Sequence, residues 1–309
     1  MKIFIEKKYA ARFPETIKKS LEEKGNVFCD CETECEAYVG TSLDSEKLNA
    51  MRHLKAVFAP KAGADKFPLV EMRDRGIALT VSHACAPYVA EHAFALTLAL
   101  LHRVIELHGD LLEGNWNAGR SSWSALRNKT VGIIGFGAVG REYAKLLTSF
   151  GCVVLVPDRG KKVPQGVKKK SVHALLSESD VLLFALPKTD DSIKLLSDDD
   201  YSLLSGKFII NVGRAETLKE EKIFGLLERG SLAGFASDVW SVAQGRSEKE
   251  AARSVSKYPF WKFKNVVMSP HCAIHASEAE NVAVEDIAEK LSVFCDGGQV
   301  ANVDYDAGY

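Results

Sequence analysis

Short apolar runs alternate along this chain with segments whose apolar residues recur at helical spacing. In the first part, runs at 3–5, 56–59 and 77–81 are separated by helical segments such as 14–23. From residue 130 the alternation resumes, with strand-like runs at 130–134, 152–156, 181–186, 208–212, 232–236 and 266–268, and helical patterns from 139, at 171–176 and at 218–229. Alternating strands and helices predict parallel sheets covered on both faces by helices. The sequence therefore predicts an α/β protein with two doubly wound parallel-sheet domains.

Two helices are expected to connect these domains. The first begins near Pro87, a favourable first-turn residue, and runs to about Leu112. Its segment 94–101 is hydrophobic nearly all round, as in a helix covered on every side, and is too short to span a bilayer. The second helix, 277–294, returns to the first unit. We therefore expect a discontinuous domain of residues 1–95 and 280–309, and a second domain of residues 96–279.

The most informative local pattern is a set of glycines directly after the strand 130–134. Gly135, Gly137 and Gly140 have the spacing G-x-G-x-x-G, and a helical pattern follows them. In such a unit the first glycine permits a tight turn, the second lets backbone approach a pyrophosphate, and the third allows close packing of helix on strand. Asp158 ends the next strand, 23 positions after Gly135, where a carboxylate accepts from ribose hydroxyls. The pattern predicts a dinucleotide site.

Composition narrows the functional classes. The 309 residues include 40 basic and 41 acidic side chains, a net charge of −1 that favours neither nucleic acid nor an anionic membrane. The start, residues 1–6, has a strand-like pattern and lacks the apolar core of a signal peptide, so we expect a cytoplasmic protein. Among the seven cysteines, Cys29, Cys31 and Cys35 cluster without a second group that would complete a zinc site. No metal is expected.

Several ordered blocks resemble the D-isomer-specific 2-hydroxyacid dehydrogenases, the family that includes phosphoglycerate, glycerate, formate and D-lactate dehydrogenases and glyoxylate reductases. Besides the glycine fingerprint, the resemblance rests on residues 76–80, 89–92, 114–116, 186–189, 211–214, 238–240, 265–266 and 269–271. It implies a Rossmann NAD-binding domain and a flavodoxin-like substrate domain. It also implies NAD-dependent hydride transfer at C2 of a small D-2-hydroxy or 2-oxo acid. The family's homodimer contact involves the helix that corresponds to 87–112.

The resemblance also implies roles for residues that follow predicted strands. Arg214 is matched by the arginine that orients the substrate, and its planar fork suits a carboxylate. His271 is matched by the catalytic acid and base, and an imidazole side chain suits proton exchange near neutrality. A surface salt bridge and a hydrogen-bonded loop histidine are the simpler alternatives. In the first domain, Lys61, Gly63 and Ala64 match a loop that holds the substrate carboxylate.

The cofactor site implied by the motifs comprises Gly135, Gly137, Ala138, Val139, Gly140, Asp158, Arg159, Leu186, Pro187, Val212, Gly213 and Asp238. In the family, the aspartate matched by Asp238 lies near the nicotinamide, although a simple strand-end turn is the alternative. Asp158 repels a 2′-phosphate and favours NAD. The cations that follow it, Arg159, Lys161 and Lys162, oppose that preference, so NADP stays open.

One family feature is missing. The glutamate that normally bonds the catalytic histidine would fall at Ala243. Gln244 is the favoured replacement, as in the formate dehydrogenase branch, while Glu248 or Glu250 folding back and the absence of any carboxylate are alternatives. Glutamine orients an imidazole but does not stabilise imidazolium as a carboxylate does. A weakly or non-catalytic NAD(H)-binding protein and a formate dehydrogenase-like enzyme therefore stay open beside the reductase.

Overall fold

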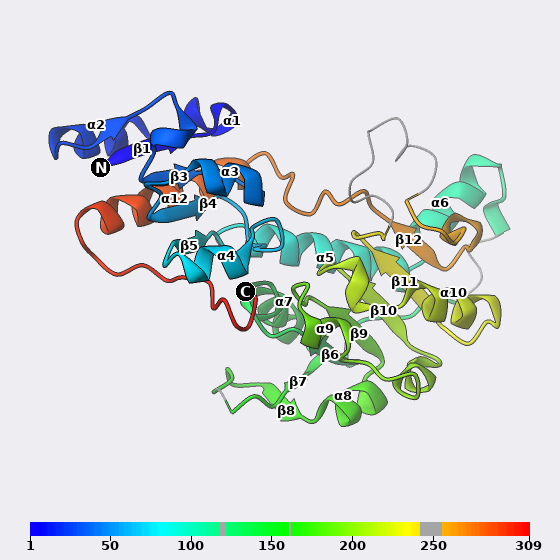
Figure 1. The fold of residues 1–309 in the computed structure, drawn as a ribbon. Coiled ribbons are helices and arrows are strands. Elements are labelled where there is room, and N and C mark those ends of the chain that lie inside the picture. The colour runs from blue at the N-terminus through cyan, green and yellow to red at the C-terminus, as the bar shows by residue number, and fades with distance from the viewer. Residues whose placement is uncertain (118–121, 161, 242–254) are drawn as a thin grey trace. The chain divides into compact units, whose positions relative to one another are not determined.

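The protein is described here by a computed structural model that covers residues 1–309 except 118–121, 161 and 242–254 (Figure 1). The chain divides into two compact units, Met1–Cys85 with Ile274–Tyr309, and Ala86–Ala273. The division expected from the sequence, at 95/96 and 279/280, cuts through helix α5 (Ala86–Leu101), which here lies wholly in the second unit. Helix α5 continues without a break across 95/96, so the apolar pattern of this helix does not mark where one unit ends and the other begins.

The first unit is built on a five-stranded parallel sheet. Its strand order is β2-β1-β3-β4-β5, the flavodoxin-type order. The strands are β1 (Lys2–Ile5), β2 (Val27–Phe28), β3 (Ala37–Val39), β4 (Ala56–Ala59) and β5 (Ala78–Val81). The helices are α1 (Lys7–Ala10), α2 (Glu15–Glu23), α3 (Ser45–Ala50), α4 (Leu69–Asp74) and α12 (Ala279–Cys295), with a 3₁₀ turn at Glu32–Glu34. Apolar residues of α2 and α12 cover one face, and those of α3 and α4 cover the other.

The second unit contains a seven-stranded parallel sheet of order β12-β11-β10-β9-β6-β7-β8. Its strands are β6 (Thr130–Ile134), β7 (Val153–Pro157), β8 (Val167–Lys170), β9 (Val181–Phe184), β10 (Phe208–Asn211), β11 (Gly234–Ser237) and β12 (Val266–Met268). Its helices are α5, α6 (Val104–Leu112), α7 (Ala138–Ser149), α8 (Val172–Glu178), α9 (Asp190–Ile193) and α10 (Glu220–Glu228), with 3₁₀ turns at Asp200–Leu204, Ala215–Thr217 and Phe260–Lys262. The order reverses between β9 and β6, the position where doubly wound sheets bind ligands.

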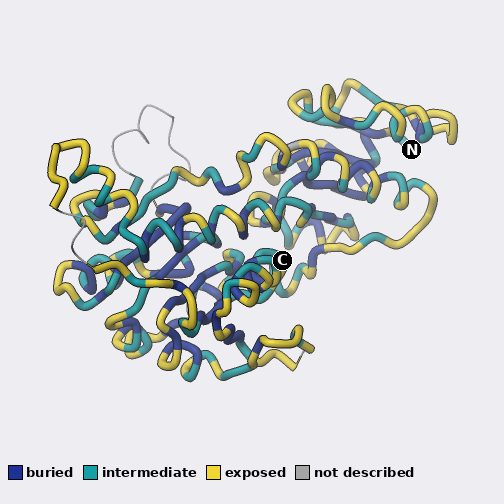
Figure 2. Tube along the Cα trace, turned by 180° about the vertical axis from the view of Figure 1, so that it is seen from behind, coloured by how far each residue is buried: buried dark blue, intermediate teal, exposed yellow. Residues whose placement is uncertain are grey.

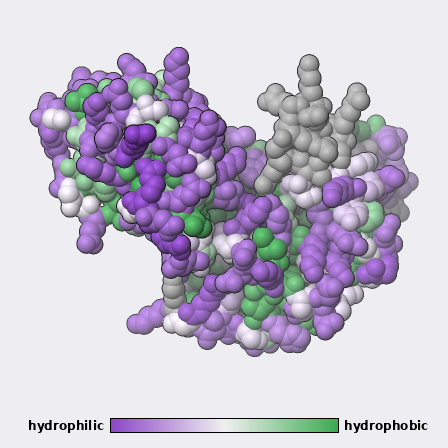
Figure 3. Space-filling model, in the orientation of Figure 1, coloured by the Kyte–Doolittle hydropathy of each residue, from purple (hydrophilic) through white to green (hydrophobic). Residues whose placement is uncertain are grey.

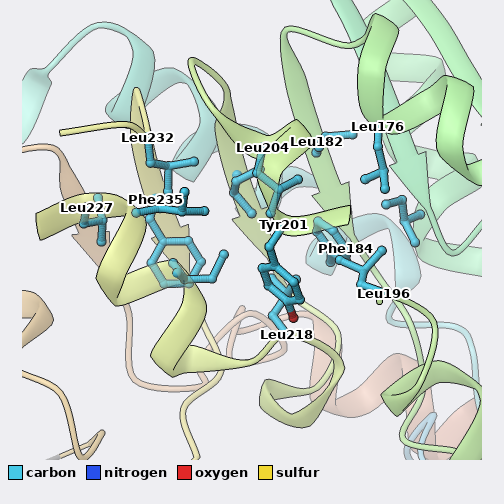
Figure 4. Packing of buried hydrophobic residues seen from close by; sticks show 14 of the residues in the cluster. Leu176, Leu182, Phe184, Leu196, Tyr201, Leu204, Leu218, Leu227, Leu232 and Phe235 are labelled. Atoms are coloured by element: carbon cyan, nitrogen blue, oxygen red, sulfur yellow. The ribbon is translucent and has the colours of Figure 1, made fainter. Parts of the chain in front are cut away.

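The core of the second unit follows the period of two along its strands. Ile133 of β6 belongs to the cluster beneath α5 and α7, and the next residue, Ile134, belongs to the cluster beneath α8 and α10. Register keeps each face together, because Ile133 lies opposite Leu183 of β9 and Ile134 lies opposite Phe184. Figure 4 shows Phe184 among the labelled apolar side chains of one cluster, and in Figure 2 the buried residues form dark-blue stretches of the trace. The alternation predicted from sequence thus fills two separate cores.

The prediction of a single helix over 87–112 is wrong, because the structure has two helices there. Helix α5 ends at Leu101 and α6 begins at Val104, with a bend of 58° between their axes. At the break, Arg103 adopts a left-handed backbone (φ 56°), and its guanidinium donates to Glu106 at 2.6 and 2.7 Å. Helical periodicity continues across this break, so hydropathy alone does not detect it.

Three strands were not expected: β2, β3 and β8. β2 and β3 are only two and three residues long, and the β8 sequence Val167–Lys170 carries three consecutive lysines. In the described part of the chain, no single helix is long and apolar enough to cross a membrane, and only the bent pair α5 and α6 meets that measure jointly. On the face drawn in Figure 3, hydrophobic residues occur in small groups among hydrophilic ones.

Candidate active site

The glycine fingerprint forms the turn from β6 into α7. Gly135 has a φ of +106°, and a Cβ there would lie 2.5 Å from the carbonyl oxygen of Ala185, so only glycine fits. A Cβ on Gly140 would collide with the carbonyl oxygen of Gly135. Gly137 differs, because it precedes the first residue of α7 and a Cβ there would meet nothing within 4 Å. Two glycines are therefore required by the protein's own packing, while the third faces open space.

The loops after β6, β9 and β10 close on one another through backbone atoms. A Cβ on Gly213 would lie 2.5 Å from the carbonyl oxygen of Leu186, and Gly135 touches Ala185 in the same way. The Gly213 amide donates to the Asn211 side chain at 3.1 Å, which fixes the turn after β10. Of the predicted cofactor residues, Gly135, Leu186 and Gly213 are thus brought together at the carboxyl ends of three neighbouring strands. Pro187 and Val212 flank them and are half-buried.

Asp158 follows β7 and is exposed. Its Oδ1 accepts from the Gly160 amide at 3.0 Å and lies 3.2 Å from Lys169 Nζ. The hydrogen bond from the Gly160 amide, followed by that from Lys169, holds the pKa of the Asp158 carboxyl below its ordinary value. Lys169 belongs to β8, a strand that the sequence pattern did not indicate. Arg159 and Lys162 are exposed, and Lys161 lies outside the described residues.

Arg214 directly follows the turn after β10 and is half-buried. Its guanidinium Nη1 donates to the Gly213 carbonyl at 3.0 Å. Its own carbonyl accepts from Thr217 Oγ1 at 2.7 Å and from Asn211 Nδ2 at 3.2 Å, so the backbone that carries the guanidinium is fixed. The structure therefore places Arg214 at the carboxyl edge of the sheet, as expected.

Asp238, which follows β11, accepts hydrogen bonds from the loop after β12. It is only 3% exposed. Its Oδ1 accepts from Ser269 Oγ at 2.7 Å and from the Cys272 amide at 2.9 Å, and its Oδ2 accepts from the Ala273 amide at 3.0 Å. Between these donors lies His271, exposed and with a left-handed backbone (φ 55°), a conformation that is costly for residues other than glycine. Asp238 therefore stabilises the turn that carries His271.

His92 of α5 extends this network. Its Nε2 lies 3.1 Å from Ser269 Oγ and 3.6 Å from Asp238 Oδ1. Trp240 Nε1 donates to the Ser269 carbonyl at 2.9 Å, which holds the same loop from another side. Burial and the neighbouring Asp238 carboxylate raise the pKa of the Cys272 thiol. Sequence reasoning assigned no role to His92, Ser269 or Cys272. The block 89–92 was the available signal for His92.

The predicted substrate loop of the first unit follows β4. Lys61 is half-buried, with Nζ 5.2 Å from the centre of the Phe67 ring, and its carbonyl accepts from the Ser82 amide at 3.0 Å. Ala64 is buried and accepts from the Phe67 amide at 3.1 Å, while Gly63 is half-buried. The loop thus lies at the carboxyl end of its strand, and its role in binding substrate stays a prediction.

The position of the missing glutamate lies outside the described residues, together with Gln244, Glu248 and Glu250. What partners the His271 side chain there therefore stays a prediction, with the alternatives as given above.

Comparisons with known proteins identify the family of the second unit. Residues 94–273 match the family model for the D-isomer specific 2-hydroxyacid dehydrogenase, NAD binding domain. Glyoxylate reductase of Thermococcus litoralis is 27% identical over 272 residues, covering 84% of this chain and 79% of that protein. D-3-phosphoglycerate dehydrogenase of Archaeoglobus fulgidus is 29% identical over 276 residues, covering 85% of this chain but 49% of that protein.

Solved structures show the same fold. D-2-hydroxyisocaproate dehydrogenase superposes with a TM-score of 0.79 at 23% identity, covering 98% of this chain and 99% of that one. D-lactate dehydrogenase of Aquifex aeolicus gives 0.76 at 22% identity, covering 96% of each chain. With the family model matched across the unit that holds the glycine turn and the Asp238 network, this chain belongs to the D-isomer-specific 2-hydroxyacid dehydrogenase family and contains its NAD-binding domain.

Proposed function

We propose that this protein is an NAD-dependent oxidoreductase that transfers hydride between nicotinamide and C2 of a small D-2-hydroxy or 2-oxo acid. The observation that carries the proposal is the shared edge of the seven-stranded sheet. Arg214 follows β10, Asp238 follows β11 and His271 follows β12, all at strand carboxyl ends. A carboxylate-binding cation and a proton donor therefore come from neighbouring loops.

The described residues fit a dinucleotide on steric and electrostatic grounds. In the described part of the chain no side chain caps the start of α7, so its first amides are available to a pyrophosphate, which the helix dipole also favours. The space beside Gly137 admits backbone approach, and Asp158 Oδ2 is available to ribose hydroxyls. When bound, the nicotinamide supplies or accepts the hydride.

In the reductive direction, Arg214 binds the substrate carboxylate through paired N–H groups and orients the carbonyl carbon. As C2 gains the hydride, negative charge grows on the carbonyl oxygen. Protonated His271 donates its proton to that oxygen, which yields the hydroxyl group and neutral imidazole. Oxidation is the reverse, with neutral His271 taking the hydroxyl proton. The loop of Lys61, Gly63 and Ala64 is proposed to add backbone donors for the carboxylate.

The missing glutamate is consistent with two alternative functions. Without a carboxylate at position 243, a protein that binds NAD(H) with little or no turnover is consistent with the chain. With Gln244 beside His271, formate oxidation is a further alternative, because hydride removal from formate requires no proton transfer. Arg214 and His271 are both retained, and their retention favours the reductase over either alternative.

For the cofactor we propose NAD over NADP, supported by the exposed Asp158 carboxylate with its lowered pKa. Lys169 opposes this preference, because its ammonium at 3.2 Å partly neutralises Asp158 and is available to a 2′-phosphate. The balance is decided by dissociation constants, and tighter binding of NADPH than of NADH contradicts the proposal.

We also propose a homodimer, supported by the outer face of α6 and the residues after it. Large apolar side chains there are exposed, namely Val104, Ile105, Leu111, Leu112 and Trp116. Apolar surface of this extent is typical of an interface. A monomer by light scattering at micromolar concentration contradicts this proposal.

A cytoplasmic location is consistent with the seven cysteines, none of which is paired in the described chain.

One assay separates the three functions. The loss of NADH absorbance is followed with glyoxylate, hydroxypyruvate or pyruvate. The gain of NADH absorbance is followed with NAD⁺ and formate. Consumption of NADH with a 2-oxo acid supports the reductase. NADH production from formate alone indicates the formate dehydrogenase-like enzyme. Saturable NADH binding without turnover of any substrate indicates the binding protein.

A further inference from the structure

We propose that His92, Asp238 and Cys272 form a binding site for a zinc-type divalent cation. One donor atom from each, an imidazole nitrogen, a carboxylate oxygen and a thiol sulfur, lie within 4.8 Å of one another. The three residues come from helix α5, from the end of β11 and from the loop after β12, all in the second unit. This site goes beyond the proposed redox function, and its existence does not depend on that function.

The separations are close to those of a tetrahedral centre. Ligand atoms at the usual bond lengths of about 2.0–2.3 Å from zinc are roughly 3.3–3.7 Å apart. The distance from His92 Nε2 to Asp238 Oδ1 is 3.6 Å, within that range. The remaining separations reach at most 4.8 Å, so closure requires a shift of about 1 Å. Cys272 is half-buried, and rotation about its single side-chain torsion provides such a shift.

The donor set selects the class of cation. Zinc and cadmium bind thiolate, imidazole and carboxylate together, whereas magnesium and calcium favour oxygen ligands alone. Three protein ligands leave a fourth position for water, the arrangement of an open zinc site. Cys272 distinguishes this cluster from an ordinary His–Asp pair, since a thiol contributes little to hydrogen bonding but binds zinc strongly.

The carboxylate is already oriented by its surroundings. Asp238 is held by Ser269 Oγ at 2.7 Å and by the amides of Cys272 and Ala273 at 2.9 and 3.0 Å. Outer donors of this kind fix ligand orientation and raise metal affinity. Oδ1, the oxygen 3.6 Å from His92 Nε2, accepts two of these hydrogen bonds and Oδ2 accepts one, so a bound cation shares the carboxylate with these donors. The protein thus presents one rigid ligand and two that close on it.

Occupancy has a consequence for the neighbouring turn. Cys272 directly follows His271, and Asp238 accepts from the Ser269 hydroxyl before that residue and from the amides of Cys272 and Ala273 after it. A cation bound by both fixes the turn in one geometry and draws Cys272 toward α5. Under the proposed function, we expect zinc to lower the reductase rate over the same concentration range in which it binds.

The test is a titration of the apo chain with Cd²⁺, followed by sulfur-to-cadmium charge-transfer absorption and by calorimetry. We expect one ion per chain. Cys272→Ser is expected to abolish the charge-transfer band, and His92→Gln to weaken binding about tenfold or more. Cys31→Ser, which removes an exposed thiol of the other unit, is the matched control and is expected to change neither. A band that persists in Cys272→Ser and disappears in Cys31→Ser overturns the proposal.

A second measurement uses the wild-type chain and avoids any folding defect of the variants. Zn²⁺ is expected to protect Cys272 from iodoacetamide, read by peptide mass spectrometry, while alkylation of Cys31 is unchanged. Equal alkylation of Cys272 with and without Zn²⁺ overturns the site. Zn²⁺ inhibition of activity that remains in Cys272→Ser contradicts the consequence drawn above. Failure of all redox assays with intact cation binding contradicts only the proposed function.

Discussion

Two regions of the same sheet edge are built in different ways. The glycine turn and Asp158 lie close together in the sequence, their surroundings are largely backbone, and Gly137 and Asp158 are exposed. The histidine turn combines residues from α5, β11 and the loop after β12, and its central carboxylate is buried. The first region depends on the absence of side chains, and the second depends on a complete set of hydrogen bonds.

This difference separates binding from chemistry. Changes in the glycine turn are expected to act on dinucleotide affinity, because the space beside Gly137 is open and no protein atom lies there within 4 Å of a Cβ. Changes around Asp238 are expected to act on the geometry of His271, because each of its oxygens is used by that loop. The four predictions below test whether the two regions act separately.

The largest effect is expected from His271→Ala. Loss of the proton donor should lower the reductive kcat by about a hundred- to ten-thousandfold. The NADH dissociation constant should stay within a few fold, because the glycine turn is untouched. Stopped-flow reduction and NADH fluorescence titration measure the two quantities. Parallel loss of affinity and turnover would show that the regions are not separate.

Next in size is Asp238→Ala. It leaves a hydroxyl and two amides of a half-buried loop without their acceptor, at a cost of about 2–4 kcal/mol in the free energy of unfolding. Asp238→Asn keeps one acceptor oxygen and is expected to cost less. Urea unfolding monitored by circular dichroism gives both values. Equal stability of Asp238→Ala and wild type would contradict the role of Asp238 in holding the turn.

The glycine turn offers a matched pair of variants. Gly140→Ala places a methyl group against the Gly135 carbonyl and is expected to destabilise the protein by about 1–3 kcal/mol. Gly137→Ala meets no protein atom within 4 Å, so stability should be nearly unchanged while NADH affinity falls. Thermal unfolding and fluorescence titration separate the two effects. A stable Gly140→Ala that binds NADH normally would contradict the packing argument.

The smallest effect concerns Lys169. Lys169→Ala removes a cation 3.2 Å from Asp158, so NADPH affinity should fall about tenfold while NADH affinity changes within twofold. Lys162→Ala, an exposed cation near the same turn, is the control. Calorimetric titration with both cofactors gives the ratio. An equal effect of the two variants on NADPH would indicate a diffuse field rather than a specific contact.

Much of the architecture could be predicted from the amino-acid order. Alternation of buried residues along β6, β9 and β10 specified strands with two apolar faces, and the glycine spacing specified a turn into a helix. These patterns are carried within a few residues, because strand period and glycine sterics are local properties. The family resemblance added the positions of Arg214 and His271, whose catalytic roles stay predictions.

Other features depended on contacts between distant segments. The break at Arg103, the lysine of β8 beside Asp158, and the network of His92, Asp238 and Cys272 have no local pattern. His92 and Cys272 are brought within reach of Asp238 only because α5 packs on β11 and β12. Hydrogen bonds and ion pairs between such segments depend on side-chain positions a few tenths of an ångström apart. Hydropathy and spacing carry no information at that scale, so those features required the folded chain.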